Sequence, residues 1–191
     1  MKSILYFFIS FYLLINFSIS IQDEVSYKIN VYIFDKPLIF SNKMKISSIP
    51  NAEKYPFLKL QAEFWSCKKW EEVLALHSPN SAKLIEEKGM KKYFEKMREK
   101  EKSKIFIQTY TAYLTVISEK ETIMLVQSVP FKIDKKLLSK LTSFRVQGYR
   151  KLNGVWKIDK TLQKSNLGII VANTNPKNLK EAIYSLIKFR K

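Results

Sequence analysis

The chain has 191 residues, of which 46% are apolar and 14% aromatic, and its formal net charge is +17. This composition excludes a disordered or collagen-like chain, because there is enough apolar material to form a core. With one cysteine, Cys67, and one histidine, His77, the chain has no internal disulfide framework and no multi-cysteine metal site. We therefore expect one folded domain that carries neither a metal nor another cofactor.

The first 20 residues have the layout of an export signal. Lys2 precedes an uncharged run rich in Ile, Leu and Phe, and Ser18 and Ser20 provide small residues at the −3 and −1 positions of a cleavage site. The alternative is an uncleaved anchor, because the uncharged stretch 3–22 has 20 residues and a membrane-spanning helix needs roughly 17–25. The small residues favour cleavage near Ser20. Both interpretations place the rest of the chain in the periplasm or outside the cell.

Residues 21–52 are predicted to form an N-terminal strand and a linker. Residues 25–34 are rich in β-branched and aromatic side chains, and residues 38–40 continue the strand beyond a proline. From 53 to 77 the apolar residues recur at helical spacing, which predicts one long helix. A second helical region follows, with Ser78 as its N-cap, Pro79 at its first position and Gly89 as a break.

At residue 105 the apolar pattern changes from helical to alternating. Residues 105–117 and 122–129 are predicted to be a long strand and its return strand. Asn153-Gly154 is the favoured dipeptide of a two-residue hairpin turn between strands 144–152 and 155–162. That turn fixes the expected pairs as Tyr149–Ile158, Lys151–Trp156, Gln147–Lys160 and Arg145–Leu162. An apolar run at 167–171 and a helix at 177–191 complete the chain.

The chain has two helical regions, then long antiparallel hairpins, and it closes on the segment Tyr149–Asp159, whose last strand reads Gly154-Val155-Trp156-Lys157-Ile158-Asp159. This order and this closing strand resemble the nuclear-transport-factor-two-like superfamily. The helix that carries Trp65 and Trp70 is similar to the first helix of that family. The resemblance implies an α+β fold, in which helices pack on a curved antiparallel sheet to form a cone with an internal pocket. The domains would then be an export signal, an extra N-terminal strand, the cone and a C-terminal helix, at 1–20, 21–52, 53–176 and 177–191.

The sequence offers few candidate residues for catalysis and more candidates for ligand binding. We expect an apolar pocket with one polar handle and with His77 nearby, and its candidate residues are Trp65, Tyr110, Tyr113, Arg145, Tyr149, Trp156 and His77. A base could be His77, although a cation at a helix C-terminus is the expected role, or Asp159, although a solvated strand residue is expected. No residue is assigned as catalytic, and the sequence favours a protein that is not an enzyme.

Positive charge is concentrated in residues 131–164, which hold ten basic and two acidic residues. The basic surface that we expect there consists of Lys132, Lys135, Lys136, Lys140, Arg150, Lys151, Lys157, Lys160 and Lys164. With 30 Lys and only four Arg, this charge reflects coding bias and solubility or an anionic partner, and it disfavours specific nucleic-acid recognition.

Three functions stay open from the sequence. The first is an exported, non-catalytic binding module that contacts an envelope or protein partner, or an anionic surface, and holds a small apolar ligand. The second is a small-molecule isomerase or cyclase, which the resemblance implies as an alternative. The third is a membrane-anchored subunit of a secretion assembly, which requires that 3–22 stay attached. The resemblance also favours a homodimer through the sheet.

Overall fold

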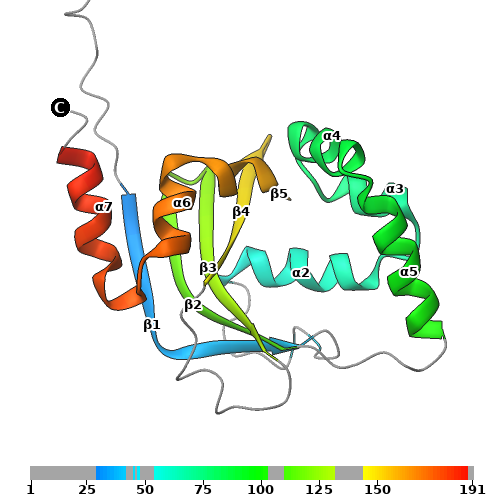
Figure 1. Ribbon diagram of the computed structural model, residues 1–191, viewed down its shortest axis with the longest axis horizontal. Coiled ribbons are helices and arrows are strands. Elements are labelled where there is room, and N and C mark those ends of the chain that lie inside the picture. The colour runs from blue at the N-terminus through cyan, green and yellow to red at the C-terminus, as the bar shows by residue number, and fades with distance from the viewer. Residues whose placement is uncertain are drawn as a thin grey trace, which may run out of the picture.

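A computed structural model describes residues 29–41, 45, 47, 54–102, 110–131 and 144–188. The fold is α+β, as the sequence predicts, with five antiparallel strands in chain order and helices on both faces of the sheet (Figure 1). The strands are β1 (Ile29–Ser41), β2 (Tyr110–Glu119), β3 (Ile123–Phe131), β4 (Arg145–Leu152) and β5 (Val155–Ile158). The predicted export signal, residues 25–28, residues 105–109 and Lys132, Lys135, Lys136 and Lys140 lie outside the described residues.

Two irregularities bend the sheet. The register of β1 against β2 shifts between Ile33 and Leu38, next to Pro37, and the register of β2 against β3 shifts between Tyr113 and Thr115. Extra residues in one strand of an antiparallel pair bend that strand and increase its twist. Figure 1 shows β1 turning sharply along its length, so the sheet is curved rather than flat.

The first helical layer is divided into four helices, α2 (Pro56–Ser66), α3 (Trp70–Ala75), α4 (Pro79–Glu87) and α5 (Met90–Lys102). The prediction of one continuous helix over 53–77 is wrong. The chain leaves the helix in extended geometry at Cys67, and the Glu72 carboxylate accepts hydrogen bonds from the N–H groups of Lys68 and Lys69 to start α3. Apolar spacing continues through this break, so periodicity alone does not reveal it.

The predicted start and break of the second helical region are confirmed. Ser78 Oγ accepts a hydrogen bond from Ser81 N at 3.3 Å, and Pro79 occupies the first position of α4. Gly89 separates α4 from α5 with φ +63°, in the left-handed region that favours glycine.

The two faces of the sheet carry separate cores. On one face α2 packs on β1–β4 through a cluster that includes Phe57, Tyr113 and Tyr149. On the other face the helices η4 (Lys160–Lys164), α6 (Asn166–Asn173) and α7 (Leu179–Lys188) pack on the sheet around Ile117, Leu125 and Ile183 (Figure 1). The short helix η5 (Pro176–Asn178) connects α6 to α7 and has no buried residue.

Gln127 connects this second layer to the sheet. It is buried on β3 and donates hydrogen bonds from Nε2 to the carbonyl oxygens of Val171 and Thr174, both at 2.7 Å. Its Oε1 accepts a hydrogen bond from Thr115 Oγ1. These carbonyls lie near the C-terminal end of α6, where the last carbonyls of a helix lack partners within the helix, so Gln127 fixes that end.

The closing hairpin follows the predicted register as far as the strand extends. Tyr149 pairs with Ile158 and Lys151 pairs with Trp156 across the Asn153-Gly154 turn, whose two residues both have positive φ. The prediction that the return strand reaches residue 162 is wrong, because the chain turns into η4 at Lys160. Gln147 and Arg145 therefore do not pair with Lys160 and Leu162.

Candidate functional site

The central aromatic residues of the predicted pocket lie in the packed core between α2 and the sheet. Tyr113 is 0% exposed and Tyr149 is 2% exposed. The ring of Phe57 lies between them, with its centroid 4.9 Å from that of Tyr113 and 6.2 Å from that of Tyr149. Burial raises the pKa of both phenols well above the ordinary value. Tyr149 donates to Gln147, whereas the Tyr113 hydroxyl has no hydrogen-bond partner among the described residues.

The other predicted pocket residues lie around the edges of this core. Trp65 on α2 and Trp156 on β5 are partly buried and pack against it. Tyr110 begins β2, where it pairs with Ser41 and Phe131. Arg145 begins β4 and is exposed. The structure thus brings Tyr113, Tyr149, Trp65 and Trp156 into one cluster, while Arg145 lies exposed at the start of β4.

His77 is part of the sheet edge. It is 5% exposed and forms a parallel bridge with Ile158, while Ser78 N donates to the Ile158 carbonyl and Ile158 N donates to the Leu76 carbonyl. Its Nδ1 donates to the Val73 carbonyl at 2.7 Å, so in the neutral ring Nε2 carries the lone pair. Burial lowers the pKa of His77, although the bond to Val73 opposes this. The expected role of a helix-terminal cation is wrong, because burial disfavours the charged ring.

Asp159 is also buried, at 1% exposed, so the expectation of a solvated strand residue is wrong. Its Oδ2 accepts a hydrogen bond from Arg150 Nε at 2.7 Å, and its Oδ1 accepts from the backbone N and the hydroxyl of Thr161. Burial raises the pKa of this carboxyl, but the hydrogen bonds from Arg150 and Thr161 outweigh burial and lower it. Both oxygens are occupied, so Asp159 caps η4 and neutralises Arg150.

Two more basic side chains of the hairpin also contact other parts of the fold. Lys157 donates to the Ala75 carbonyl at 2.6 Å, which connects β5 to the end of α3. Lys151 lies 4.0 Å from the carboxylate of Glu121, in a pair that is exposed to water. The hairpin therefore uses much of its positive charge within the protein.

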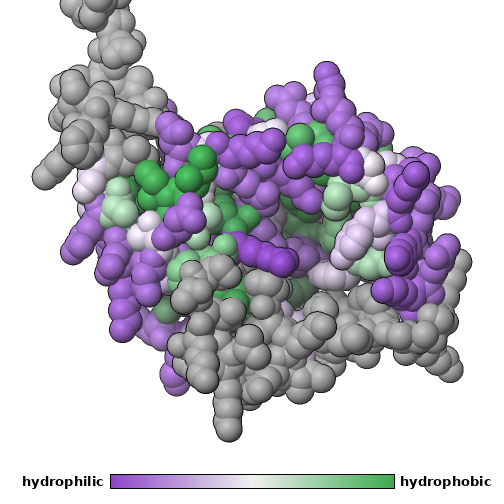
Figure 2. Space-filling model, viewed as in Figure 1, coloured by the Kyte–Doolittle hydropathy of each residue, from purple (hydrophilic) through white to green (hydrophobic). Residues whose placement is uncertain are grey.

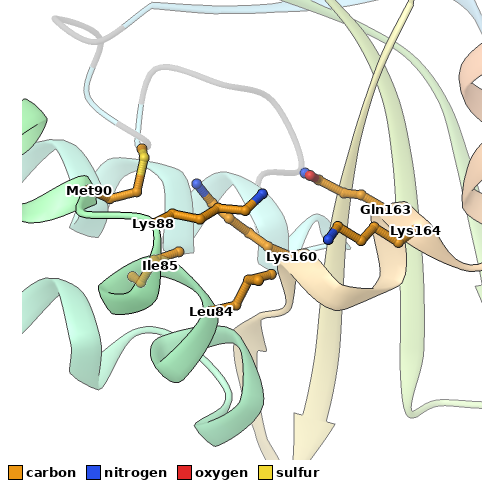
Figure 3. A pocket seen from close by; sticks show the side chains of 7 residues that line it. All are labelled: Leu84, Ile85, Lys88, Met90, Lys160, Gln163 and Lys164. Atoms are coloured by element: carbon orange, nitrogen blue, oxygen red, sulfur yellow. The ribbon is translucent and has the colours of Figure 1, made fainter.

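A different situation holds in the hollow between α4 and η4, which has a volume of about 150 Å³. Figure 2 shows a hollow on this face of the molecule, with hydrophilic side chains along its upper border and apolar side chains inside it. Figure 3 shows the basic side chains reaching over the hollow from both sides: Lys88 follows α4, and Lys160 and Lys164 come from η4. Gln163 joins them, and Leu84, Ile85 and Met90 form the apolar part of the lining. We call this set the lysine hollow.

The lysines of this hollow lack acidic partners in the described part of the chain. No carboxylate there lies within ion-pair distance of Lys88, Lys160 or Lys164. Burial lowers the pKa of Lys160, and the ammonium of Lys88 lowers it further. Like charges that gather without a counter-charge attract an anion.

Backbone contacts hold the lysine hollow in place. Lys160 N donates to Ser81 Oγ at 3.0 Å, which connects η4 to the first turn of α4. Asp159 caps η4 from the other side. Sequence reasoning named Lys160 and Lys164 but missed Lys88, Gln163 and the apolar lining, because Lys88 lies in a helical region whose mixed Lys and Glu residues indicate a solvated face.

Comparisons with protein-family models, with curated proteins and with solved structures give no match to this chain. In the described residues, no helix has the length and apolar character needed to cross a membrane. The same residues contain no group of three or more His, Cys, Asp or Glu side chains placed to hold a metal ion.

Proposed function

We propose that this chain is an exported, non-catalytic binding module that contacts an anionic partner through its basic surface. The observation that carries the proposal is the lysine hollow, where Lys88, Lys160 and Lys164 gather with no carboxylate partner in the regions described. On the neighbouring β4–β5 hairpin, the side chains of Arg150, Lys157 and Lys151 contact Asp159, Ala75 and Glu121. Charge that the fold does not use is available to a partner.

The proposal includes a nuclear-transport-factor-two-like cone and an N-terminal export signal. The curved sheet, with its register shifts at Ile33/Leu38 and Tyr113/Thr115 and α2 packed on one face, supports the cone. The cleavage motif ending at Ser20 supports export. N-terminal sequencing of the mature protein tests the export signal. A start at Ile21 supports cleavage, whereas a start at Met1 supports an attached anchor instead.

Binding fits the observations better than acid–base catalysis. Both oxygens of Asp159 accept hydrogen bonds from Arg150 and Thr161, so the carboxylate is held as a structural group. His77 is buried against the sheet edge and bonded to Val73. A general base has to come within hydrogen-bond reach of a substrate proton, and neither group is placed to do so.

The test of the function is a salt titration of binding. Vesicles with an anionic lipid surface should retain the mature protein, which starts at Ile21, at low ionic strength and release it as the salt concentration rises toward about 1 M, where the Debye length falls to about 3 Å. Neutral vesicles are the control. Equal binding to neutral and anionic vesicles, or no binding to either at low salt, would contradict the proposed function.

A further inference from the structure

The size of the lysine hollow restricts its ligand to a small group. Its volume of about 150 Å³ is roughly five times the 30 Å³ that one water molecule occupies in the liquid. Sites for drug-sized ligands measure about 300–1,000 Å³. The hollow therefore accommodates about five heavy atoms, and the rest of a larger ligand would extend outside it.

The charge of the hollow selects among small anions. Three ammonium groups reach over the hollow, from Lys88, Lys160 and Lys164 (Figure 3). A carboxylate has one negative charge, whereas a phosphate monoester carries close to two at neutral pH and has five heavy atoms in its phosphate group. Lysine binds phosphate as a point charge, without the two-pronged geometry that arginine requires. The phosphate group therefore matches the hollow in both size and charge.

The lining adds a second requirement. Leu84 and Ile85 from α4 and Met90 from the start of α5 lie beside the lysines. An inorganic anion leaves this apolar surface uncovered, whereas an aliphatic substituent next to the phosphate would contact it. Burying such surface stabilises a complex by roughly 25 cal/mol per Å².

The hollow is also held in position before any ligand arrives. Ser81 Oγ accepts the hydrogen bond from Lys160 N, and Asp159 caps η4. Gly89 ends α4 directly after Lys88. Because the backbone that carries the lysines is fixed by the fold, it loses little conformational entropy when a ligand binds.

We propose that the lysine hollow binds the phosphate group of an aliphatic phosphate monoester, with the ammonium groups of Lys88, Lys160 and Lys164 around the phosphate and Leu84, Ile85 and Met90 against its first carbons. This inference rests on the proposed binding function and names the ligand class of that site. The same chemistry is presented by a free monoester and by the headgroup of phosphatidic acid in a bilayer.

The direct test is calorimetric titration of the full-length protein with butyl phosphate and with inorganic phosphate. We expect butyl phosphate to bind more tightly than inorganic phosphate. Lys88→Gln and Lys160→Gln should each weaken binding about tenfold, which corresponds to about 1.4 kcal/mol. Lys83→Gln is the matched control, because Lys83 lies on the same helix α4 but pairs with Glu87 at 3.9 Å. It should leave the Kd within about twofold.

Three results would contradict this inference, and the first two would overturn it. One is the absence of binding at butyl phosphate concentrations up to about 10 mM, which is about ten times a Kd of about 1 mM. The second is an equal loss of affinity for butyl phosphate in Lys83→Gln and Lys88→Gln, because it would show diffuse electrostatic attraction rather than binding at a site. The circular dichroism and thermal unfolding of each variant establish that it is folded. The third concerns the lining: Leu84→Ser should weaken the binding of butyl phosphate and leave the binding of inorganic phosphate unchanged. Equal weakening of the binding of both ligands would contradict the assigned lining.

Vesicles separate the two sources and keep this inference distinct from the proposed function. Binding to phosphatidic acid vesicles that Lys88→Gln weakens supports the lipid headgroup as the source, whereas binding to butyl phosphate alone supports a free monoester. If anionic vesicles bind equally well with Lys88→Gln and butyl phosphate does not bind, the hollow is excluded as the site while the basic binding module stands.

Discussion

Two neighbouring regions of this protein use positive charge in opposite ways. In the β4–β5 hairpin, Arg150 is bonded to the buried carboxylate of Asp159 and Lys157 donates to the Ala75 carbonyl. In the lysine hollow, Lys160, which directly follows Asp159, lies with Lys164 and Lys88, and the three have no carboxylate partner within the described regions.

The difference separates charge that stabilises the fold from charge that is available for binding. Removing one partner of a buried, hydrogen-bonded pair leaves the other group without compensation. Removing one cation from a like-charged group relieves repulsion instead. The net charge of +17 does not distinguish these two kinds of charge, because the basic residues of both regions are counted in it alike.

The largest expected effect comes from forcing apart the hairpin and η4 with Gly148→Ala. A Cβ at this position would lie 2.4 Å from the Asp159 carbonyl oxygen and 2.7 Å from Leu162 Cβ, so the backbone has to move. We expect a loss of about 3 kcal/mol or more in the free energy of unfolding, measured by urea denaturation. Gly154→Ala is the control, since it meets no atom within 4 Å and has only its φ of +81° to strain. Gly154→Ala should lower the free energy of unfolding by about 1 kcal/mol. Equal losses for the two variants would contradict the close approach of Gly148 to Asp159 and Leu162.

The next effect tests the buried pair itself. Asp159→Asn removes the charge that Arg150 and Thr161 bond, and we expect a loss of about 2 kcal/mol in the free energy of unfolding. Glu121→Gln removes the exposed partner of Lys151 and should change stability by less than about 0.5 kcal/mol. Similar values for the two variants would show that the Arg150 pair is no stronger than a surface pair.

A smaller effect comes from the histidine at the hairpin edge. The folded state lowers the pKa of His77 from 6.5, so the unfolded chain binds the proton more readily and stability falls as the pH drops below 6.5. Two charged groups act on this pKa: the ammonium of Lys160 lowers it and the carboxylate of Asp159 raises it. Between about pH 7.5 and 5.5 the free energy of unfolding of the wild type, measured by urea denaturation, should fall by up to about 1.4 kcal/mol. His77→Gln should remove this dependence, and an unchanged slope would contradict the buried neutral ring.

The smallest effect on stability is expected in the lysine hollow. Lys160→Gln removes a half-buried charge that Lys88 repels, so the free energy of unfolding should stay within about 0.5 kcal/mol of the wild type or rise. Butyl phosphate at about ten times its Kd should stabilise the wild type by about 1.4 kcal/mol. Thermal unfolding with and without the ligand measures both values. A large loss of stability in the ligand-free variant would place Lys160 among the structural charges.

Local patterns predict this fold where one short segment specifies the geometry. Asn153-Gly154 determines the turn and the Tyr149–Ile158 pair, and Ser78 with Pro79 determines where α4 begins. The patterns fail where a distant partner decides the outcome. Asp159 resembles a solvated strand residue in the sequence, but η4 begins there and Arg150 lies across the hairpin.

The candidate site was harder to predict than the fold. Lys88 and Lys160 are 72 residues apart in the sequence, and neither belongs to a motif with a fixed spacing. They meet because Ser81 and Lys160 connect α4 to η4. Aromatic residues such as Tyr113 and Tyr149 were easier to select, yet their size suits a core as well as a pocket, and here they pack around Phe57.

The sequence by itself determined the α+β class, the closing hairpin and the concentration of basic residues in 131–164, because each depends on residues that are close along the chain. Only the tertiary structure decided how that charge is divided. Burial made Asp159 a structural partner of Arg150, and the packing of α4 on η4 left Lys88, Lys160 and Lys164 together. Whether a charge stabilises the fold or attracts a ligand depends on its nearest neighbours in space, and those neighbours come from distant parts of the chain.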